Sequence, residues 1–317
     1  MTAAPLSLAD KAAVTRRITA LSVVVAGVLV VIKVIAWRGS GSVAMLASAA
    51  DSGLDLIASL VTFYAVRYAA APPDAEHRYG HGKAEAFASL VQAGLVFASA
   101  ALVAREAIGR LITPEPVEQG MWAIGVMALS IVLTLGLITA QNRALHSVQS
   151  VAVSGDRAHY ASDLASNAAA LIGIAGAALF GLDWLDALAG LIVTAILIAA
   201  AVKVFREASN QLMDRELPEA ERRRIVELAS ADPRLRDVHE LRTRMSGPYV
   251  HVQMHVELDP QLPLLEAHEV MVAAENRILE EFPAADIIIH PDPQDRAEPH
   301  GGPFAEDRTP VPTAPVA

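Results

Sequence analysis

The chain has 317 residues, of which 53% are hydrophobic, and it carries a formal net charge of −10. From residue 212 onward it contains 21 acidic and 11 basic residues, so this part accounts for the whole negative charge. Such a balance argues against nucleic-acid binding, which needs a basic surface. The sequence contains no cysteine, which excludes disulfides and thiolate metal sites.

Long apolar segments, separated by short stretches rich in glycine and proline, occupy the chain up to residue 211. A membrane-spanning helix needs about 20 mostly apolar residues. We therefore predict a polytopic α-helical membrane domain over residues 14–211, preceded by a short cytoplasmic segment, residues 1–13. The six predicted spans are 14–36, 42–70, 84–110, 119–142, 156–181 and 184–206.

Lysine and arginine are unequally distributed between the two ends of these spans. Six spans place both termini on one side of the membrane, and cytoplasmic loops carry the excess of basic residues. The side that holds the N-terminus carries most of the basic residues, whereas the opposite side has only Arg38 and Arg110 near its span ends. Both termini are therefore predicted to be cytoplasmic.

The part from residue 212 to 294 has the pattern of a small soluble domain. Valine and methionine alternate with polar residues over 249–258, which is the period of a half-buried strand. An αββαβ order of elements suits an α+β sandwich with helices on one face of a sheet. Residues 295–317 are rich in proline, glycine and charge and are predicted to be disordered. The predicted elements are a helix at 219–231, strands at 237–246 and 249–258, a helix at 263–282 and a strand at 286–290.

Two pairs of ionisable residues lie inside the second and fifth predicted spans. Asp51 and Asp55, like His159 and Asp163, are spaced i, i+4, so each pair projects from one helix face. A charged aspartate at the centre of a membrane helix costs roughly 2.5–3.5 kcal/mol on insertion scales, so the pairs indicate a function. Three carboxylates and one imidazole suit tetrahedral Zn²⁺ better than Mg²⁺, which prefers oxygen ligands alone. The alternative interpretation is that these residues line a water-filled cavity or cap helix ends.

Other polar residues have structural interpretations. Lys33 is predicted to extend its ammonium group to the membrane surface, and Glu85 lies near the end of a predicted span. His251 lies four residues from His255 on one strand face, about 13 Å away at the usual strand rise, too far to share an ion. His251 is therefore interpreted as a surface histidine.

Three short segments share a pattern of aspartate and histidine. Residues 51–55 read Asp-Ser-Gly-Leu-Asp, residues 74–85 contain His-Gly-Lys-Ala-Glu, and residues 159–163 read His-Tyr-Ala-Ser-Asp. Together they resemble the cation diffusion facilitator family, and within it the bacterial ferrous-iron and zinc efflux branch. The resemblance extends over residues 10–294.

The resemblance implies a transporter and not an enzyme. It implies a homodimer in the bacterial inner membrane, with six spanning helices and a cytoplasmic domain of metallochaperone-like fold. Such a protein would move Zn²⁺, or alternatively Fe²⁺ or Cd²⁺, out of the cytoplasm in exchange for protons, by alternating access. The metal would be both substrate and regulator.

The resemblance also implies three metal sites and a contact that locks the dimer. From the residues alone, His77 and His81 are also consistent with incidental histidines of a solvated loop, and Lys83 and Asp214 with plain surface charges. The implied residues are Asp51, Asp55, His159 and Asp163 for the transport site; Asp74, His77 and His81 for a loop site; His239, His255, His268, His290 and Asp292 for a binuclear cytoplasmic site; and Lys83 with Asp214 for the salt bridge.

Three other functions share some of these features. A metal-gated channel would use the same ligands, but a closed four-ligand site binds too tightly for fast conduction. A membrane-anchored metal sensor would need no carboxylates inside the membrane. An intramembrane metalloenzyme would need an open coordination position and a nearby general base.

Overall fold

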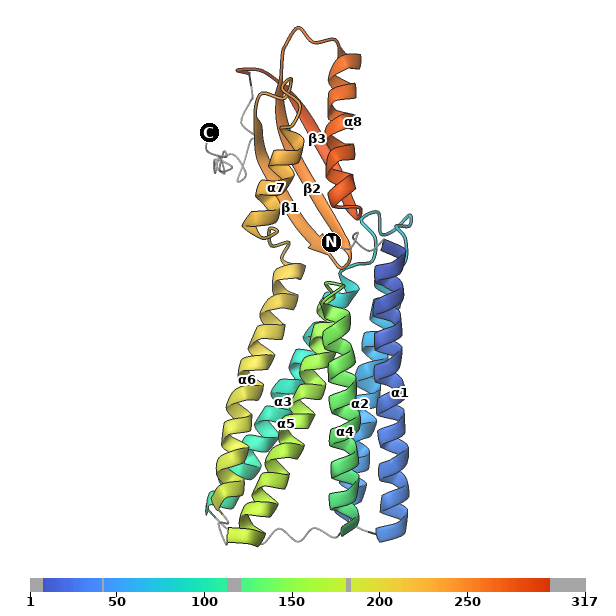
Figure 1. Ribbon diagram of the computed structural model, residues 1–317, viewed down its shortest axis with the longest axis vertical. Coiled ribbons are helices and arrows are strands. Elements are labelled where there is room, and N and C mark those ends of the chain that lie inside the picture. Colours follow the sequence, from blue (N-terminus) through green and yellow to red (C-terminus); the bar gives the residue numbers. More distant parts are fainter. Residues whose placement is uncertain (1–7, 42, 113–120, 181–183, 297–317) are drawn as a thin grey trace. The chain divides into compact units, whose positions relative to one another are not determined.

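The computed structural model describes residues 8–41, 43–112, 121–180 and 184–296 (Figure 1). The contacts between residues divide the chain into two compact units, one formed by residues 9–209 and the other mainly by the chain from residue 210. Most of the tail predicted to be disordered, and the first seven residues, lie outside the described ranges.

The larger unit consists, within the described ranges, of six long helices, as predicted. Five of them are long and apolar enough to cross a membrane, namely all except α5. Helix α5 has 30 residues, and its side chains at position 170 and over 172–180 lie outside the described part. The helices are α1 (Leu8–Ser40), α2 (Val43–Ala69), α3 (Ala84–Ile112), α4 (Met121–Leu145), α5 (Val151–Phe180) and α6 (Trp184–Leu212).

Several helices extend beyond the predicted spans. Helix α1 begins at Leu8 and ends at Ser40, whereas the apolar segment suggested 14–36. Hydrophobicity marks only the part of a helix that lies in lipid, while the backbone hydrogen bonds continue through polar turns such as the one that holds Arg16. As a result, Lys33 lies well inside α1 and not at its end.

Small residues allow close packing of α3 against α5 and α6. A side chain at Gly155 of α5 would place its Cβ 2.8 Å from Ser89 Oγ of α3. Likewise, a Cβ at Gly190 of α6 would lie 2.9 Å from the Ala107 Cβ. Small residues commonly line helix contacts in membranes, because the backbones can then approach closely.

The smaller unit has the predicted αββαβ order. Strand β2 is central: it pairs antiparallel with β1 and parallel with β3. Strand β3 runs from Ala285 to Pro293, longer than predicted, because it continues its pairing with β2 past Pro291. Proline is tolerated there because β3 is an edge strand. The elements are α7 (Glu219–Ala229), β1 (Val238–Ser246), β2 (Tyr249–Leu258), α8 (Leu264–Glu281) and β3 (Ala285–Pro293).

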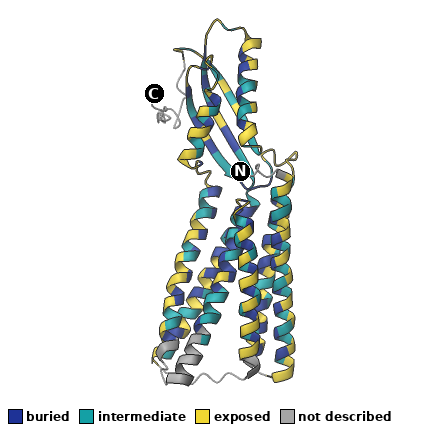
Figure 2. Cartoon of the chain, viewed as in Figure 1, coloured by how far each residue is buried: buried dark blue, intermediate teal, exposed yellow. Residues whose placement is uncertain are grey.

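The core of the smaller unit lies between one face of the sheet and the two helices (Figure 2). Val252, Met254 and Val256 of β2 are buried there with Val270 and Ile278 of α8. Successive residues of a strand point to opposite faces. The polar residues that alternate with these three therefore point to the other face of the sheet, away from α7 and α8.

Candidate metal centres

Three of the four predicted transport-site residues meet inside the membrane unit. His159 Nε2 of α5 lies 3.0 Å from Asp55 Oδ1 of α2 and 3.8 Å from Asp163 Oδ2. One ligand atom from each residue lies within 4.8 Å of the other two. Ligands of a tetrahedral zinc ion are about 3.3 Å apart, given bonds of about 2.0 Å. The three groups are therefore spaced to hold one ion after small side-chain movements.

Asp51 lies at the edge of this cluster. It precedes Asp55 by one turn of α2 and is more exposed. Its charge interacts with those of Asp55, Lys33 and His159. Asp51 thus lies within electrostatic range of the other three predicted ligands, but outside the compact group that they form.

Lys33 does not extend to the membrane surface, so that prediction was wrong. The residue is only 9% exposed, and its Nζ donates a hydrogen bond to Ser52 Oγ at 2.6 Å. Ser52 follows Asp51 in α2, and the lysine charge acts on both Asp51 and Asp163. The prediction failed because α1 is longer than its apolar segment and meets α2 at this position.

A buried carboxylate, Asp156, was missed by the sequence analysis. It lies one turn before His159 on α5 and is fully buried. It accepts hydrogen bonds from Gln141 Nε2 of α4 at 2.8 Å and from Gln92 Nε2 of α3 at 3.3 Å. Ser59 Oγ of α2 donates at 3.5 Å. Three helices therefore direct hydrogen-bond donors at one carboxylate of α5.

The hydrogen bonds around Asp156 extend to α1 as well. The Tyr160 hydroxyl lies 2.7 Å from Ser59 Oγ and donates to the Ser22 carbonyl at 3.3 Å. Gln141 Nε2 also donates to Ser22 Oγ at 3.2 Å. A polar network of five helices thus lies next to the transport-site residues. The sequence signal for it was the set of amide and hydroxyl side chains within otherwise apolar spans.

Glu85 lies in the first turn of α3, near a span end as predicted, but its side chain is buried. It is 5% exposed and accepts a hydrogen bond from Ser150 Oγ at 2.6 Å. Ser150 lies just before α5, so Glu85 connects the beginning of α3 to the beginning of α5.

The loop between α2 and α3 brings Asp74, His77 and His81 together. Asp74 Oδ1 lies 3.3 Å from His77 Nδ1, and Asp74 Oδ2 lies 3.2 Å from His81 Nε2. The backbone N–H of His77 donates to the Asp74 carboxylate and is the main cause that holds its pKa below the usual value. Asp74 therefore stays ionised and, with two imidazoles beside it, could bind a divalent cation.

A cluster of three histidines and one aspartate, called the cytoplasmic cluster below, lies on the face of the sheet opposite α7 and α8. His239, His255 and His290 occupy paired positions on β1, β2 and β3. Asp292 Oδ2 lies 2.9 Å from His255 Nδ1 and 3.2 Å from His239 Nε2. Asp292 Oδ1 lies 3.4 Å from His290 Nε2. One carboxylate thus contacts three imidazoles through both oxygens, which is a geometry that can bridge two ions.

Glu240 is a further carboxylate near this cluster that the sequence analysis missed. Its Oε2 lies 4.0 Å from His255 Nε2. The pairing of β1 with β2 is irregular after His239, and Glu240 has a positive φ of 48°. A bulge of this kind redirects a side chain and cannot be read from residue alternation.

His268, the fifth residue predicted for this site, lies elsewhere. It is exposed on α8, next to Ala267, whose side chain packs into the core. Helix α8 covers the buried face of the sheet, whereas the three strand histidines lie on the opposite face. The structure therefore does not bring His268 together with the other four predicted ligands of the same chain.

His251 is not the surface histidine that was predicted. It is 7% exposed, and its Nδ1 lies 3.1 Å from Asp286 Oδ2 on β3. Burial lowers the pKa of His251. The error arose because alternation places His251 on the open face, although neighbouring side chains cover it there.

The predicted salt bridge between Lys83 and Asp214 joins the two units and stays a prediction. Within the smaller unit, Asp214 accepts a hydrogen bond from Arg244 Nη1 at 3.3 Å. Asp214 has a positive φ of 55°, just after the end of α6.

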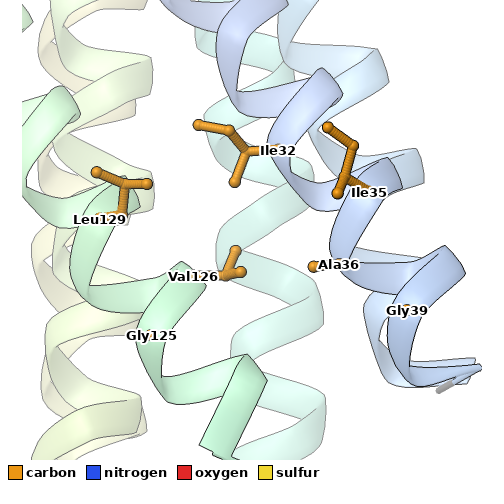
Figure 3. Close-up of a pocket in the computed structure, with 7 residues that line it drawn as sticks. All are labelled: Ile32, Ile35, Ala36, Gly39, Gly125, Val126 and Leu129. Atoms are coloured by element: carbon orange, nitrogen blue, oxygen red, sulfur yellow. The ribbon is translucent and has the colours of Figure 1, made fainter.

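An apolar pocket in the membrane unit contains none of these ligands in its described lining. It has a volume of about 600 Å³ and lies between α1 and α4 (Figure 3). Its described lining consists of aliphatic side chains and glycine, which offer no metal ligand. The lining residues are Ile32, Ile35, Ala36, Gly39, Gly125, Val126 and Leu129.

Two family descriptions together match most of the chain. Residues 19–213 match the cation efflux transmembrane domain. Residues 217–294 match the cytoplasmic domain of cation efflux proteins. The boundary between the two matches falls just after α6.

Curated relatives extend over most of the chain. Cation-efflux pump FieF of Cronobacter sakazakii is 40% identical over 90% of this chain and 94% of its own length. FieF of Shewanella oneidensis is 42% identical over 86% of this chain and 92% of its own length. FieF of Klebsiella pneumoniae is 40% identical over 84% of this chain and 89% of its own length.

A solved structure of CzrB, described as a zinc transporter, in its zinc form is 31% identical and covers 27% of this chain and 100% of its own. Its TM-score of 0.25 is too low to support a statement about the fold. The family matches and the FieF relatives do not depend on it. This chain therefore belongs to the cation efflux family, the cation diffusion facilitators, and is a membrane protein that exports divalent metal cations and not an enzyme.

Proposed function

We propose that this protein exports a zinc-like transition metal from the cytoplasm of a bacterium and imports protons in exchange. The observation that carries this proposal is the convergence of Asp55, His159 and Asp163 from two long helices of the membrane unit. Asp51 would complete the ligand set after a small movement of α2. The mixture of imidazole and carboxylate favours Zn²⁺, Fe²⁺ or Cd²⁺ over Mg²⁺.

Competition between metal and protons would drive the exchange. Metal ligands must be deprotonated, so a metal ion arriving from the cytoplasm displaces protons from this site. When the site opens to the other side of the membrane, protons displace the ion. The two loads leave the site with different charge, and this difference allows the load to favour one conformation over the other.

The two sites outside the membrane helices would respond to cytoplasmic metal. Both termini and the loop of Asp74, His77 and His81 would face the cytoplasm of a cell whose inner membrane holds the protein. The match of the smaller unit to the cytoplasmic domain of cation efflux proteins supports this placement. Metal bound to the strand histidines and Asp292 would signal that the cation is plentiful.

A homodimer would account for His268. Because α8 covers the other face of the sheet, His268 cannot join the strand histidines of its own chain. We propose that a second copy supplies this ligand. We further propose that Lys83 and Asp214 hold the two copies together near the membrane surface.

The transport assignment is tested in proteoliposomes that contain a zinc-sensitive dye. Asp163→Asn should reduce zinc uptake to that of empty vesicles, because it removes one charged ligand with little change of shape. Glu106→Gln is the matched control, since Glu106 is an exposed acidic residue paired with Arg110 on α3. Near-normal uptake by Asp163→Asn would show that the ion does not pass through this site.

A proton gradient distinguishes an antiporter from a channel. Collapsing the gradient should slow zinc uptake by the unchanged protein. A flux that does not respond to the gradient would favour a channel, even if Asp163 proves essential.

A further inference from the structure

Lys33 is a buried cation beside a site whose cargo is a cation. Its side chain is 9% exposed, and its Nζ is held by Ser52 Oγ at 2.6 Å. Ser52 is itself 1% exposed and directly follows Asp51. Burying an ammonium group inside a membrane protein is costly unless opposite charge compensates it. The nearby carboxylates supply that compensation.

The charge of the site explains why a lysine is placed there. Asp51, Asp55 and Asp163 contribute −3 when ionised, and Asp156, one turn before His159, is a further buried carboxylate beside them. Neutral His159 contributes nothing, and Lys33 contributes +1, so Lys33 lowers by one unit the negative charge that attracts the cargo. Without this positive charge, the site would hold a divalent cation more strongly in a medium of low dielectric constant.

The position of Lys33 also keeps the ammonium group out of the ligand set. The hydrogen bond to Ser52 directs Nζ to a residue between the two aspartates of α2. The charge still acts on Asp51 and Asp163, from α2 and α5. A cation held in this way repels the cargo without occupying a coordination position.

We infer that Lys33 tunes the affinity of the transport site: its positive charge weakens the binding of a divalent cation enough for the ion to be released. The inference rests on the proposed transport site. It adds a residue from α1 that coordinates nothing and acts on the cargo through charge alone.

The test measures zinc binding and transport by the full chain. The loop and cytoplasmic sites are first disabled by His77→Ala and His255→Ala, so that calorimetry reports the transport site. In this background, Lys33→Gln removes the charge but can still donate a hydrogen bond. We expect it to bind Zn²⁺ at least about tenfold more tightly, which corresponds to about 1.4 kcal/mol. We also expect KM and kcat for zinc transport to fall together, because release becomes slow.

Two further variants separate charge from structure. Lys33→Arg keeps the positive charge and should keep the zinc affinity close to its original value. Ser52→Ala removes the hydrogen bond but not the charge, so zinc affinity should stay the same or weaken, and not increase. Lys33→Met provides a second neutral side chain in case Lys33→Gln is not monodisperse in gel filtration.

The outcomes distinguish this inference from the transport site itself. If Asp163→Asn abolishes zinc binding in the same background while both neutral variants bind zinc no more tightly, the role of Lys33 is overturned and the site stands. If Asp163→Asn leaves binding unchanged, the site itself is misassigned. Tighter binding by Ser52→Ala would also contradict the inference, because it would assign the effect to the hydrogen bond.

Discussion

The predicted transport site in the membrane unit and the cytoplasmic cluster contain carboxylates and imidazoles in opposite proportions. The membrane site has carboxylates on α2 and α5 with one histidine, whereas the cytoplasmic cluster has three histidines with one aspartate in contact with all of them. Carboxylates inside a membrane are costly when charged, so they exchange metal for protons readily. Imidazole binds metal as an uncharged ligand, so histidine ligands do not carry this desolvation cost. The difference fits the proposed roles of the membrane site in transport and of the cytoplasmic cluster in sensing metal.

Removing one carboxylate from each site should have the largest and most unequal effect. Asp55→Ala should abolish zinc transport, because it deletes a ligand that lies 3.0 Å from His159. Asp292→Ala should leave measurable transport while reducing the zinc bound by the cytoplasmic domain, because it deletes the carboxylate that contacts all three histidines. Flux assays and zinc-binding stoichiometry on the same preparations check this. Equal loss of transport in both variants would remove the distinction between the two sites.

The membrane unit is stabilised by the polar network around Asp156, which the cytoplasmic cluster does not share. Asp156→Ala should lower the free energy of unfolding by about 1–3 kcal/mol, because it leaves one buried N–H of the Gln141 amide without its acceptor. Thermal unfolding of the solubilised protein measures the change. Asp156→Asn keeps one acceptor oxygen and should recover part of the loss. Zinc binding by the cytoplasmic cluster should be unaffected in both variants.

Adding a methyl group to a glycine of the membrane unit should lower stability only where another helix lies close to that glycine. Gly155→Ala places a methyl group 2.8 Å from Ser89 Oγ and 3.2 Å from the Ser89 Cα, so α3 and α5 must separate. We expect a loss of about 1–3 kcal/mol in stability. Gly136→Ala on α4 is the control, since nothing lies within 4 Å of the added Cβ. It should be neutral or slightly stabilising, because alanine favours helices. Equal melting temperatures for the two variants would contradict the contact.

The smallest expected effect concerns pH and the cytoplasmic unit. Burial lowers the pKa of His251 from its ordinary value of 6.5, so the unfolded chain binds a proton more readily than the folded one. The stability from this group is therefore complete above about pH 6.5 and declines as pH falls below that value. His251→Gln should flatten the loss of stability between neutral and mildly acidic pH, measured by thermal melting.

The transport-site pairs could be predicted from the sequence because helix geometry is regular. An i, i+4 spacing places Asp51 with Asp55, and His159 with Asp163, whatever the helices pack against. The roles of Lys33 and Asp156 depend on which helices meet and at what height. A single sequence does not show which helices are neighbours. In addition, the length of the apolar segment underestimates the length of the helix.

The cytoplasmic cluster shows a similar division. The strand pattern predicted the sheet and its buried face, because alternation follows from backbone geometry. The strand register that aligns His239, His255 and His290 could not be derived from alternation, and their assignment came from the resemblance alone. The bulge at Glu240 arises from tertiary contacts. Tertiary contacts also place α8, which carries His268, on the face of the sheet opposite the strand histidines. No local sequence pattern predicts either feature.

The histidines aligned across β1, β2 and β3 also have a mechanical consequence. Strand β3 is an edge strand, joined to the sheet along one side only. An ion held by His290, Asp292 and His255 would link the edge strand β3 to the central strand β2. Loss of the ion would weaken this link, so amide hydrogen exchange in β3 should become faster as the concentration of metal in the cytoplasm falls.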